Sequence, residues 1–155
     1  MIKKNIYTIL LMFLCGSCSN TDDKINKYIE SHCSFNGTDL CYIDIKDVLK
    51  IDYDKMYLFG ETTMANEISK VIGIPYNNDK YISDSKYRII LLKDNKIVYE
   101  DDYYQKYTYF FSLANRIEEN FYCALYTTSI FGVEKVGDNN RFTYILTIVE
   151  DNVFD

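Results

Sequence analysis

The chain has 155 residues, 48% of them hydrophobic, and this is enough for one domain with a single core. Its formal net charge of −6 disfavours nucleic acid and anionic lipid surfaces as partners and favours a basic protein, although solubility alone also explains an acidic surface. The sequence has no internal repeat and only one proline, Pro75, so no stretch reads as a linker between two domains.

Residues 1–17 have the pattern of an export signal. Two lysines near the start precede nine almost entirely apolar residues, Ile6 to Leu14, a run too short for a transmembrane helix, which needs about 20 residues. A glycine and a serine then separate this run from Cys18. Basic, apolar and small segments in this order predict a secretory signal peptide, which does not belong to the fold.

The stretch LCGSC at the end of this signal resembles the lipobox of bacterial lipoproteins. The resemblance implies that Cys18 is acylated, with palmitate or a similar chain, and becomes the new N-terminus. One departure is Cys15, which stands where leucine is usual. An ordinary cleaved signal peptide and an uncleaved anchor are the alternatives. Acyl chains on Cys18 would hold the protein to a membrane, since each buried CH₂ contributes about 0.8 kcal/mol.

Residues 18–24 are short, polar and acidic, and they predict a flexible tether between the lipidated cysteine and a single domain over residues 25–155. The expected location is the cell envelope, at the outer membrane. The acidic run after Cys18 also resembles the surface-export signal of some Gram-negative lipoproteins, so surface-exposed and periplasm-facing anchors both stay open. Loss of residues 1–17 leaves 138 residues and takes two lysines away, which moves the net charge from −6 to −8.

Three cysteines remain in the mature chain, in a compartment that favours disulfides. Cys33 and Cys41 flank a short loop with turn-forming residues, and we predict a disulfide between them. Cys123 lies in an apolar run and reads as a buried thiol, although a pairing with either of the others stays open. A metal site is not expected, because the chain has no CxxC motif and His32 is its only histidine.

The first half of the domain predicts two helices and two strands. Residues 24–32 place apolar side chains at helical spacing, while residues 41–49 alternate as a half-buried strand does, and residues 55–59 form a second strand. Residues 64–72 return to the helical period on one face. Gly73 suits the left-handed position after the end of that helix.

The second half predicts two hairpins. Residues 87–93 and 96–100 flank the turn pair Asp94–Asn95, and the unbroken apolar run in the first arm indicates a central strand covered on both faces. Residues 131–149 form the second hairpin around a Gly-Asp-Asn-Asn turn. The segment 103–129 between them is ambiguous, and its Tyr, Phe and Thr content favours strands over a helix. The helical alternative rests on Leu113, Ile117, Phe121 and Leu125, which recur at four-residue steps.

These elements predict an α+β fold with a single domain. Neighbouring strands are mostly joined by tight turns, so we expect a mainly antiparallel sheet of about six or seven strands, with two short helices on one face.

Three stretches resemble a family of small exported bacterial proteins, many of them lipoproteins. They read YIDIKDVLKIDYDKMYLFGE, EISKVIGI and IILLKDNKIVYE, and they cover residues 42 to about 100 in this order. Tyr53 stands where that family has a tryptophan, which keeps the aromatic character of the position. The family has no assigned biochemical activity, so the resemblance implies a compact exported domain and no mechanism.

The residues do not predict an enzyme. Hydrolysis by a nucleophile and base needs a histidine, and His32 lies at a helix end directly beside Cys33, whereas such pairs normally come from separate segments. Asp52, Asp54 and Glu61 lack the spacing of a calcium loop and read as turn residues. The glycines are scattered, without a phosphate loop. No cofactor is therefore expected.

Tyrosine is the unusual feature, with 16 in the chain, and the stretch VYEDDYYQKYTYFF holds five of them with three acids. Sheet packing explains most strand tyrosines, but tyrosine and acid together also suit a surface for a basic protein partner. That surface would consist of Tyr99, Glu100, Asp101, Asp102, Tyr103 and Tyr104.

The leading hypothesis is a non-enzymatic lipoprotein that binds a protein in the envelope, for example an immunity-type protein that neutralises a basic toxin. A small-molecule or glycan binder, which predicts an aromatic-lined pocket, is one alternative. An envelope hydrolase of unknown type, which would need a buried carboxylate cluster in a cleft, is the other.

Overall fold

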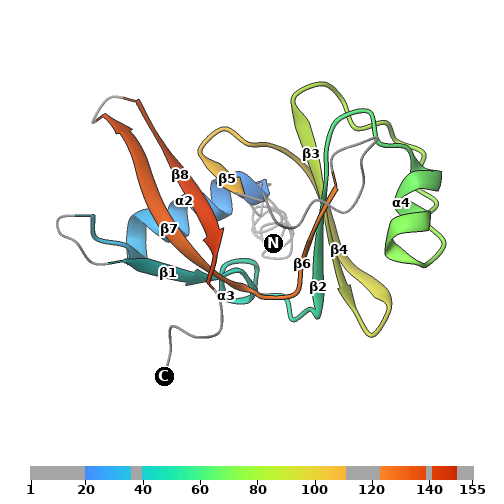
Figure 1. Ribbon diagram of the computed structural model, residues 1–155, viewed down its shortest axis with the longest axis horizontal. Helices are drawn as coiled ribbons and strands as arrows, with labels where there is room; N and C mark the ends of the chain where they lie inside the picture. The colour runs from blue at the N-terminus through green and yellow to red at the C-terminus, as the bar shows by residue number, and fades with distance from the viewer. Residues whose placement is uncertain (1–19, 36–39, 111–122, 139–140, 150–155) are drawn as a thin grey trace, which may run out of the picture.

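The computed structural model describes residues 20–35, 40–110, 123–138 and 141–149. Across these residues it confirms an α+β fold, with eight strands in two four-stranded sheets and three helices (Figure 1). The signal peptide and Cys18 lie outside the described residues, as do Leu113, Ile117 and Phe121. The strands are β1 (Cys41–Asp44), β2 (Lys55–Phe59), β3 (Lys86–Lys93), β4 (Lys96–Tyr104), β5 (Thr108–Phe110), β6 (Cys123–Tyr126), β7 (Ile130–Asp138) and β8 (Arg141–Ile148).

The strands form two sheets instead of the one predicted. The first, here called sheet A, has the order β1-β7-β8-β5, and the second, sheet B, has the order β4-β3-β2-β6. All pairs are antiparallel except β5 with β8, which is parallel. Alternation along a strand indicates which side chains are buried but not which strand lies beside it, and this is why the single-sheet prediction is wrong.

The two sheets share one core, here called core 1. It contains side chains from both sheets and from the helices α2 (Thr21–His32) and α3 (Ile45–Leu49). Three rings join the sheets there: Phe131 of β7 lies 5.3 Å from Phe110 of β5 and 5.5 Å from Tyr126 of β6, measured between ring centroids. Ile25 and Ile29 bring α2 into the same core.

A second core, core 2, lies on the other face of sheet B beneath α4 (Ala65–Ile72), which stands at the right of Figure 1. Ile68 and Ile72 of α4 are buried there, as the helical period of residues 64–72 predicted. Gly73 follows with φ +75°, the left-handed conformation predicted for it. The helices thus lie in both cores and not on one face of one sheet.

The central-strand prediction for the apolar run is confirmed. β3 pairs with β2 on one side and β4 on the other, and Ile89 to Leu92 are no more than 1% exposed. Alternate residues of this run enter core 1 and core 2. The β3–β4 turn has positive φ at both Asp94 (49°) and Asn95 (56°), which is the geometry of a type I′ turn and explains this residue pair.

The strand predicted over residues 41–49 ends early. β1 stops at Asp44, whose side chain accepts a 2.8 Å hydrogen bond from the Lys46 N–H and so caps α3. Ile45 and Leu49 of α3 both enter core 1, and Lys50 ends the helix at φ 58°. Ile45 and Leu49 are four residues apart, which also fits one face of a short helix. Alternation over only four residues therefore could not distinguish a strand from a helix here.

In the ambiguous segment 103–129, the described parts at Thr108–Phe110 and Cys123–Tyr126 are strands, in agreement with the preference for strands.

The start of the folded domain differs from the prediction. α2 begins at Thr21, capped by the Asn20 side chain, so Thr21–Lys24 belong to the folded domain and not to the tether.

Candidate functional site

The six residues predicted as a partner-binding face lie on β4, an edge strand of sheet B, but they do not form one face. Tyr103 is 1% exposed and belongs to core 1, whereas Tyr104 is 51% exposed. The other four, Tyr99 to Asp102, are partly buried and hydrogen-bonded within the protein. The acids of this stretch therefore serve the fold, and Tyr104 is the one exposed member of the six.

One group of these bonds fixes the start of α2 against β4. Thr21 donates from its backbone N–H (2.8 Å) and from its hydroxyl (2.6 Å) to Oδ2 of Asp101, and its hydroxyl lies 2.8 Å from the Tyr99 hydroxyl. Thr21 is fully buried by these contacts. The first residue of α2 is thus held at both its backbone and its side chain.

Asp22 makes a second attachment, to β5 and the residue before it. Its carboxylate accepts hydrogen bonds from the Tyr107 N–H (3.1 Å), the Thr108 N–H (3.0 Å) and the Thr108 hydroxyl. Burial raises the pKa of the Asp22 carboxyl above its ordinary value, while the hydrogen bonds from Thr108 and Tyr107 act in the opposite direction. Asp22, one of the acidic residues predicted to lie in the tether, thus links α2 to β5.

A buried charge network lies on the other face of sheet B. Arg88, 1% exposed, makes two hydrogen bonds to Asp102, of 2.6 Å from Nε and 2.8 Å from Nη2. It also donates to the Tyr76 hydroxyl (3.0 Å) and to the Lys80 carbonyl (2.9 Å). Tyr76 in turn donates to Glu100 at 2.6 Å.

This network holds the chain between α4 and β3 against sheet B. Burial and the bond to Glu100 raise the pKa of the Tyr76 hydroxyl well above its usual range, so it stays a hydrogen-bond donor. Burial lowers the pKa of Arg88, and the bonds to Asp102 more than offset this, so the guanidinium stays charged. Each donor and acceptor described here faces a protein partner, and we interpret the cluster as structural. In the sequence, the one sign of this cluster was that Arg88 directly precedes four apolar residues.

An open groove of about 590 Å³ lies beside the start of α2. Tyr104 and Tyr109 on its wall are 51% and 44% exposed. Lys86 lies over the Tyr104 ring, 5.0 Å from its centroid, and the Ser85 N–H donates to Glu61 at 2.8 Å. The groove is lined by Asn20, Asp22, Asp23, Glu61, Ser85, Lys86, Tyr87, Tyr104, Gln105, Lys106 and Tyr109.

Sequence reasoning missed this groove, because its lining comes from the start of α2, from the chain after β2, from the start of β3 and from the end of β4 through β5. No single motif contains these residues. The only signal was the richness in tyrosine, which was assigned to β4 alone.

A second surface feature is the outer face of sheet A, opposite core 1, whose residues are half-buried except for the exposed Glu134. Side chains on it alternate with buried ones: Tyr42, Gly132 and Thr147 lie side by side across β1, β7 and β8, and Ile145 pairs with Glu134. The Thr147 side chain packs closely over Gly132, because a Cβ there would meet Thr147 Oγ1 at 3.3 Å. We use the name outer face for these five residues.

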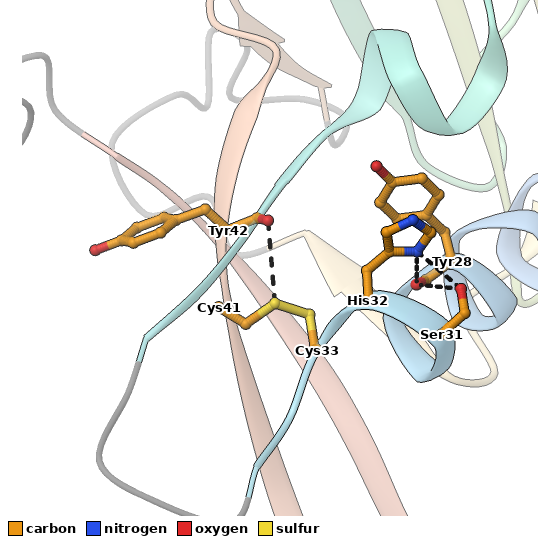
Figure 2. The surroundings of a disulfide bond; sticks show 6 residues. All are labelled: Tyr28, Ser31, His32, Cys33, Cys41 and Tyr42. Atoms are coloured by element: carbon orange, nitrogen blue, oxygen red, sulfur yellow. Dashed lines mark hydrogen bonds between the residues drawn. A yellow bond between two sulfur atoms is a disulfide. The ribbon is translucent and has the colours of Figure 1, made fainter.

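Cys33 and Cys41 form the disulfide that their spacing predicted (Figure 2). It joins the residue after α2 to the first residue of β1. His32, next to it, stacks on the Tyr28 ring at 3.9 Å between centroids and contacts the Tyr28 carbonyl through Nδ1 (3.0 Å), as Figure 2 shows. Cys123 is buried in core 2.

The remaining carboxylates considered from the sequence also have protein partners. Asp52 forms ion pairs with Lys46 and Lys93, and Asp54 accepts a 2.9 Å hydrogen bond from the Asp94 N–H. Among the described residues, no group of three or more His, Cys, Asp and Glu side chains is arranged to hold a metal ion. Within the same part of the chain, no helix has the length and apolar character needed to cross a membrane.

Comparison with known proteins gives no relative: no family model, curated protein or solved structure matches this chain. The resemblance of residues 42–100 to small exported lipoproteins therefore stays a prediction.

Proposed function

We propose that the mature chain is a lipoprotein, anchored through Cys18, that binds another envelope protein without catalysing a reaction. The observation that carries this proposal is the position at which the fold begins. Asn20 caps α2 and Thr21 is buried, so Ser19 alone separates the proposed lipid site from the folded domain. Two residues of extended chain span about 7 Å. An anchor this short would keep the domain at the membrane, where its partner would have to meet it.

The outer face of sheet A is the surface we propose for that partner. Tyr42 and Ile145, both half-buried, offer aromatic and aliphatic contact area on either side of Gly132 and Thr147. Aromatic side chains are enriched at protein interfaces because they bring a large contact area at low conformational cost. A net charge of −8 after removal of the signal would steer a basic partner toward the domain, as an immunity-type role requires.

Mass spectrometry of the membrane fraction tests the anchor. We expect wild-type protein to begin at Cys18 and to carry a diacyl or triacyl glyceryl group, and the Cys18→Ala variant to lose both the modification and the membrane association. A soluble, unmodified wild-type chain would contradict the proposal and would favour a diffusible binding role.

Crosslinking in intact envelopes tests the partner surface. We expect a crosslinked species of defined mass with wild-type protein, and its loss in Ile145→Arg, which places a charge in the middle of the outer face. Val98→Arg is the control for an added surface charge, because Val98 is 43% exposed and lies on β4 of sheet B, and urea denaturation would show that the variant at the half-buried Ile145 is folded. If Ile145→Arg and Val98→Arg crosslink alike, the outer face is not the binding surface.

The groove beside α2 favours a second candidate function, the binding of a small molecule or glycan. Its exposed Tyr104 and Tyr109 rings are suited to stacking on a sugar or another flat ligand. NMR titration of the protein with glycan fragments would then shift the resonances of these two tyrosines, and Tyr104→Ala would weaken binding. Unchanged spectra would remove this candidate.

A further inference from the structure

Exposed apolar side chains gather at one end of sheet B. The described residues include seven exposed large apolar side chains, and Met64, Tyr81 and Tyr104 are 61%, 51% and 51% exposed. Met64 follows the end of β2, Tyr81 precedes β3, and Tyr104 ends β4. Antiparallel pairing brings these strand ends together, since Phe59 pairs with Arg88 and Lys86 pairs with Tyr104.

Hydrogen bonds join the segments that carry these side chains. The Thr62 N–H donates to the Ile82 carbonyl at 3.4 Å, and the Ser85 N–H donates to Glu61 at 2.8 Å, so the chain after β2 lies beside the chain before β3. Tyr109 adds a fourth exposed apolar side chain through the groove that it lines with Tyr104. We call Tyr104 and Tyr109 the anchor-side surface; Met64 and Tyr81 line a separate pocket beside α4.

The chain enters the fold at this same surface. Asn20 lines the groove together with Tyr104 and Tyr109. Its side chain accepts a 2.9 Å hydrogen bond from the Asp23 N–H, and the bonds of Thr21 to Asp101 fix the next residue. If Cys18 carries the lipid, as proposed above, its Cα lies no more than about 7 Å from that of Asn20, which lines the groove.

We propose that the anchor-side surface lies in the headgroup layer of the membrane that holds Cys18. Tyrosine is enriched at the membrane interface because its ring is apolar and its hydroxyl is polar. Lys86 and Lys106, on the groove wall, are placed to meet lipid phosphates, since a lysine side chain extends its charge along an apolar stem.

The charges around the groove suit a zwitterionic phospholipid. Its lining carries Lys86 and Lys106 against Asp23 and Glu61, while Asp22 is buried and bonded to Thr108. The negative charge of the whole protein is therefore not concentrated where the bilayer would lie. The bilayer is favoured over a soluble partner because the anchor limits the distance of this surface from the lipid.

The absence of tryptophan from the chain makes the proposal directly measurable. The full lipidated protein would be reconstituted in phosphatidylcholine and phosphatidylethanolamine vesicles, with or without dibrominated phosphatidylcholine, which quenches tryptophan on contact. Tyr104→Trp and Tyr109→Trp place a single reporter on the anchor-side surface. Val98→Trp is the control, because Val98 is similarly exposed (43%) and lies six residues, or about 20 Å, from Tyr104 along β4.

We expect brominated lipid to cause a loss of emission in the Tyr104→Trp and Tyr109→Trp variants and no loss in Val98→Trp. Equal quenching of all three variants, or quenching of none, in protein shown by mass spectrometry to be acylated would overturn the membrane-facing surface while leaving the anchor intact. Quenching of none together with a glycan-induced change in emission would assign the groove to a soluble ligand. Failure of acylation itself would refute the proposed function instead.

Discussion

At the scale of single residues, the side chains that looked available for binding are used to hold the fold. Asp101 and Asp102 follow one another on β4, yet the first bonds to Thr21 of α2 and the second to Arg88 of β3. A charged side chain is tolerated inside a protein when it is paired and its hydrogen bonds are satisfied. Arg88 meets both conditions, since it has partners at Asp102, Tyr76 and Lys80.

The Arg88–Asp102 pair should therefore be a large local contribution to stability. Asp102→Asn removes the closer of two carboxylates beside the buried guanidinium and leaves Glu100, whose Oε1 lies 3.6 Å from Arg88 Nε, so we expect the free energy of unfolding to fall by about 1.5–3 kcal/mol in urea denaturation. Asp84→Asn, at an exposed position before the same strand, should change it by less than about 0.5 kcal/mol. Similar values for both variants would show that Arg88 finds another partner.

Asp22 should impose a pH dependence on stability. Burial raises the pKa of its carboxyl above the ordinary value of 3.8, so the folded state holds this proton more tightly than the unfolded state. Its contribution is then fully present below the unfolded pKa and is lost as the pH rises through the raised folded pKa. We expect the free energy of unfolding of wild type, relative to Asp22→Asn, to fall as pH rises from about 3 to about 7 in urea titrations. A rising difference would mean that the bonds from Thr108 and Tyr107 outweigh burial.

At the scale of elements, the ends of helices and strands depend on side chains that cap them. Asp44 stops β1 and starts α3 with one hydrogen bond to the Lys46 N–H. Asn20 caps α2, which moves the start of the domain four residues toward the N-terminus, from the predicted residue 25 to residue 21. If Cys18 carries a lipid, as proposed above, this cap also sets the length of the tether.

The disulfide joins two of these elements, the end of α2 and the start of β1. In the chain-entropy model, a cross-link across a sequence separation of 8 stabilises the fold by about 2.5 kcal/mol. We expect the Cys33→Ser, Cys41→Ser double variant to lose about this amount in chemical denaturation. Wild-type protein with added reductant should match it. If reductant leaves wild type unchanged, the bond is either absent from the isolated protein or protected from reduction.

At the scale of the whole molecule, stability rests on a core that both sheets share. Phe131 of sheet A contacts Tyr126 of sheet B as well as Phe110 of its own sheet. Because neither sheet buries its inner face alone, we expect the described domain to unfold in one transition.

Phe131→Ala tests this cooperation between the sheets. Removing a fully buried ring should lower the free energy of unfolding by about 3–5 kcal/mol. Circular dichroism in the far and near ultraviolet should show coincident transitions for wild type and variant. Two separate transitions would mean that sheet A and sheet B unfold independently.

The sequence by itself determined several local features of the described residues: the α4 helix, the Asp94–Asn95 turn and the central burial of Ile89 to Leu92. Each of these depends on a few neighbouring residues, whose period or backbone preference is readable directly. The tertiary structure decided how the strands divide into two sheets, which partners the β4 acids take and where the tyrosine groove lies. Those features join residues such as Asp22 and Thr108, which are 86 positions apart, and spacing along the chain carries no record of such contacts.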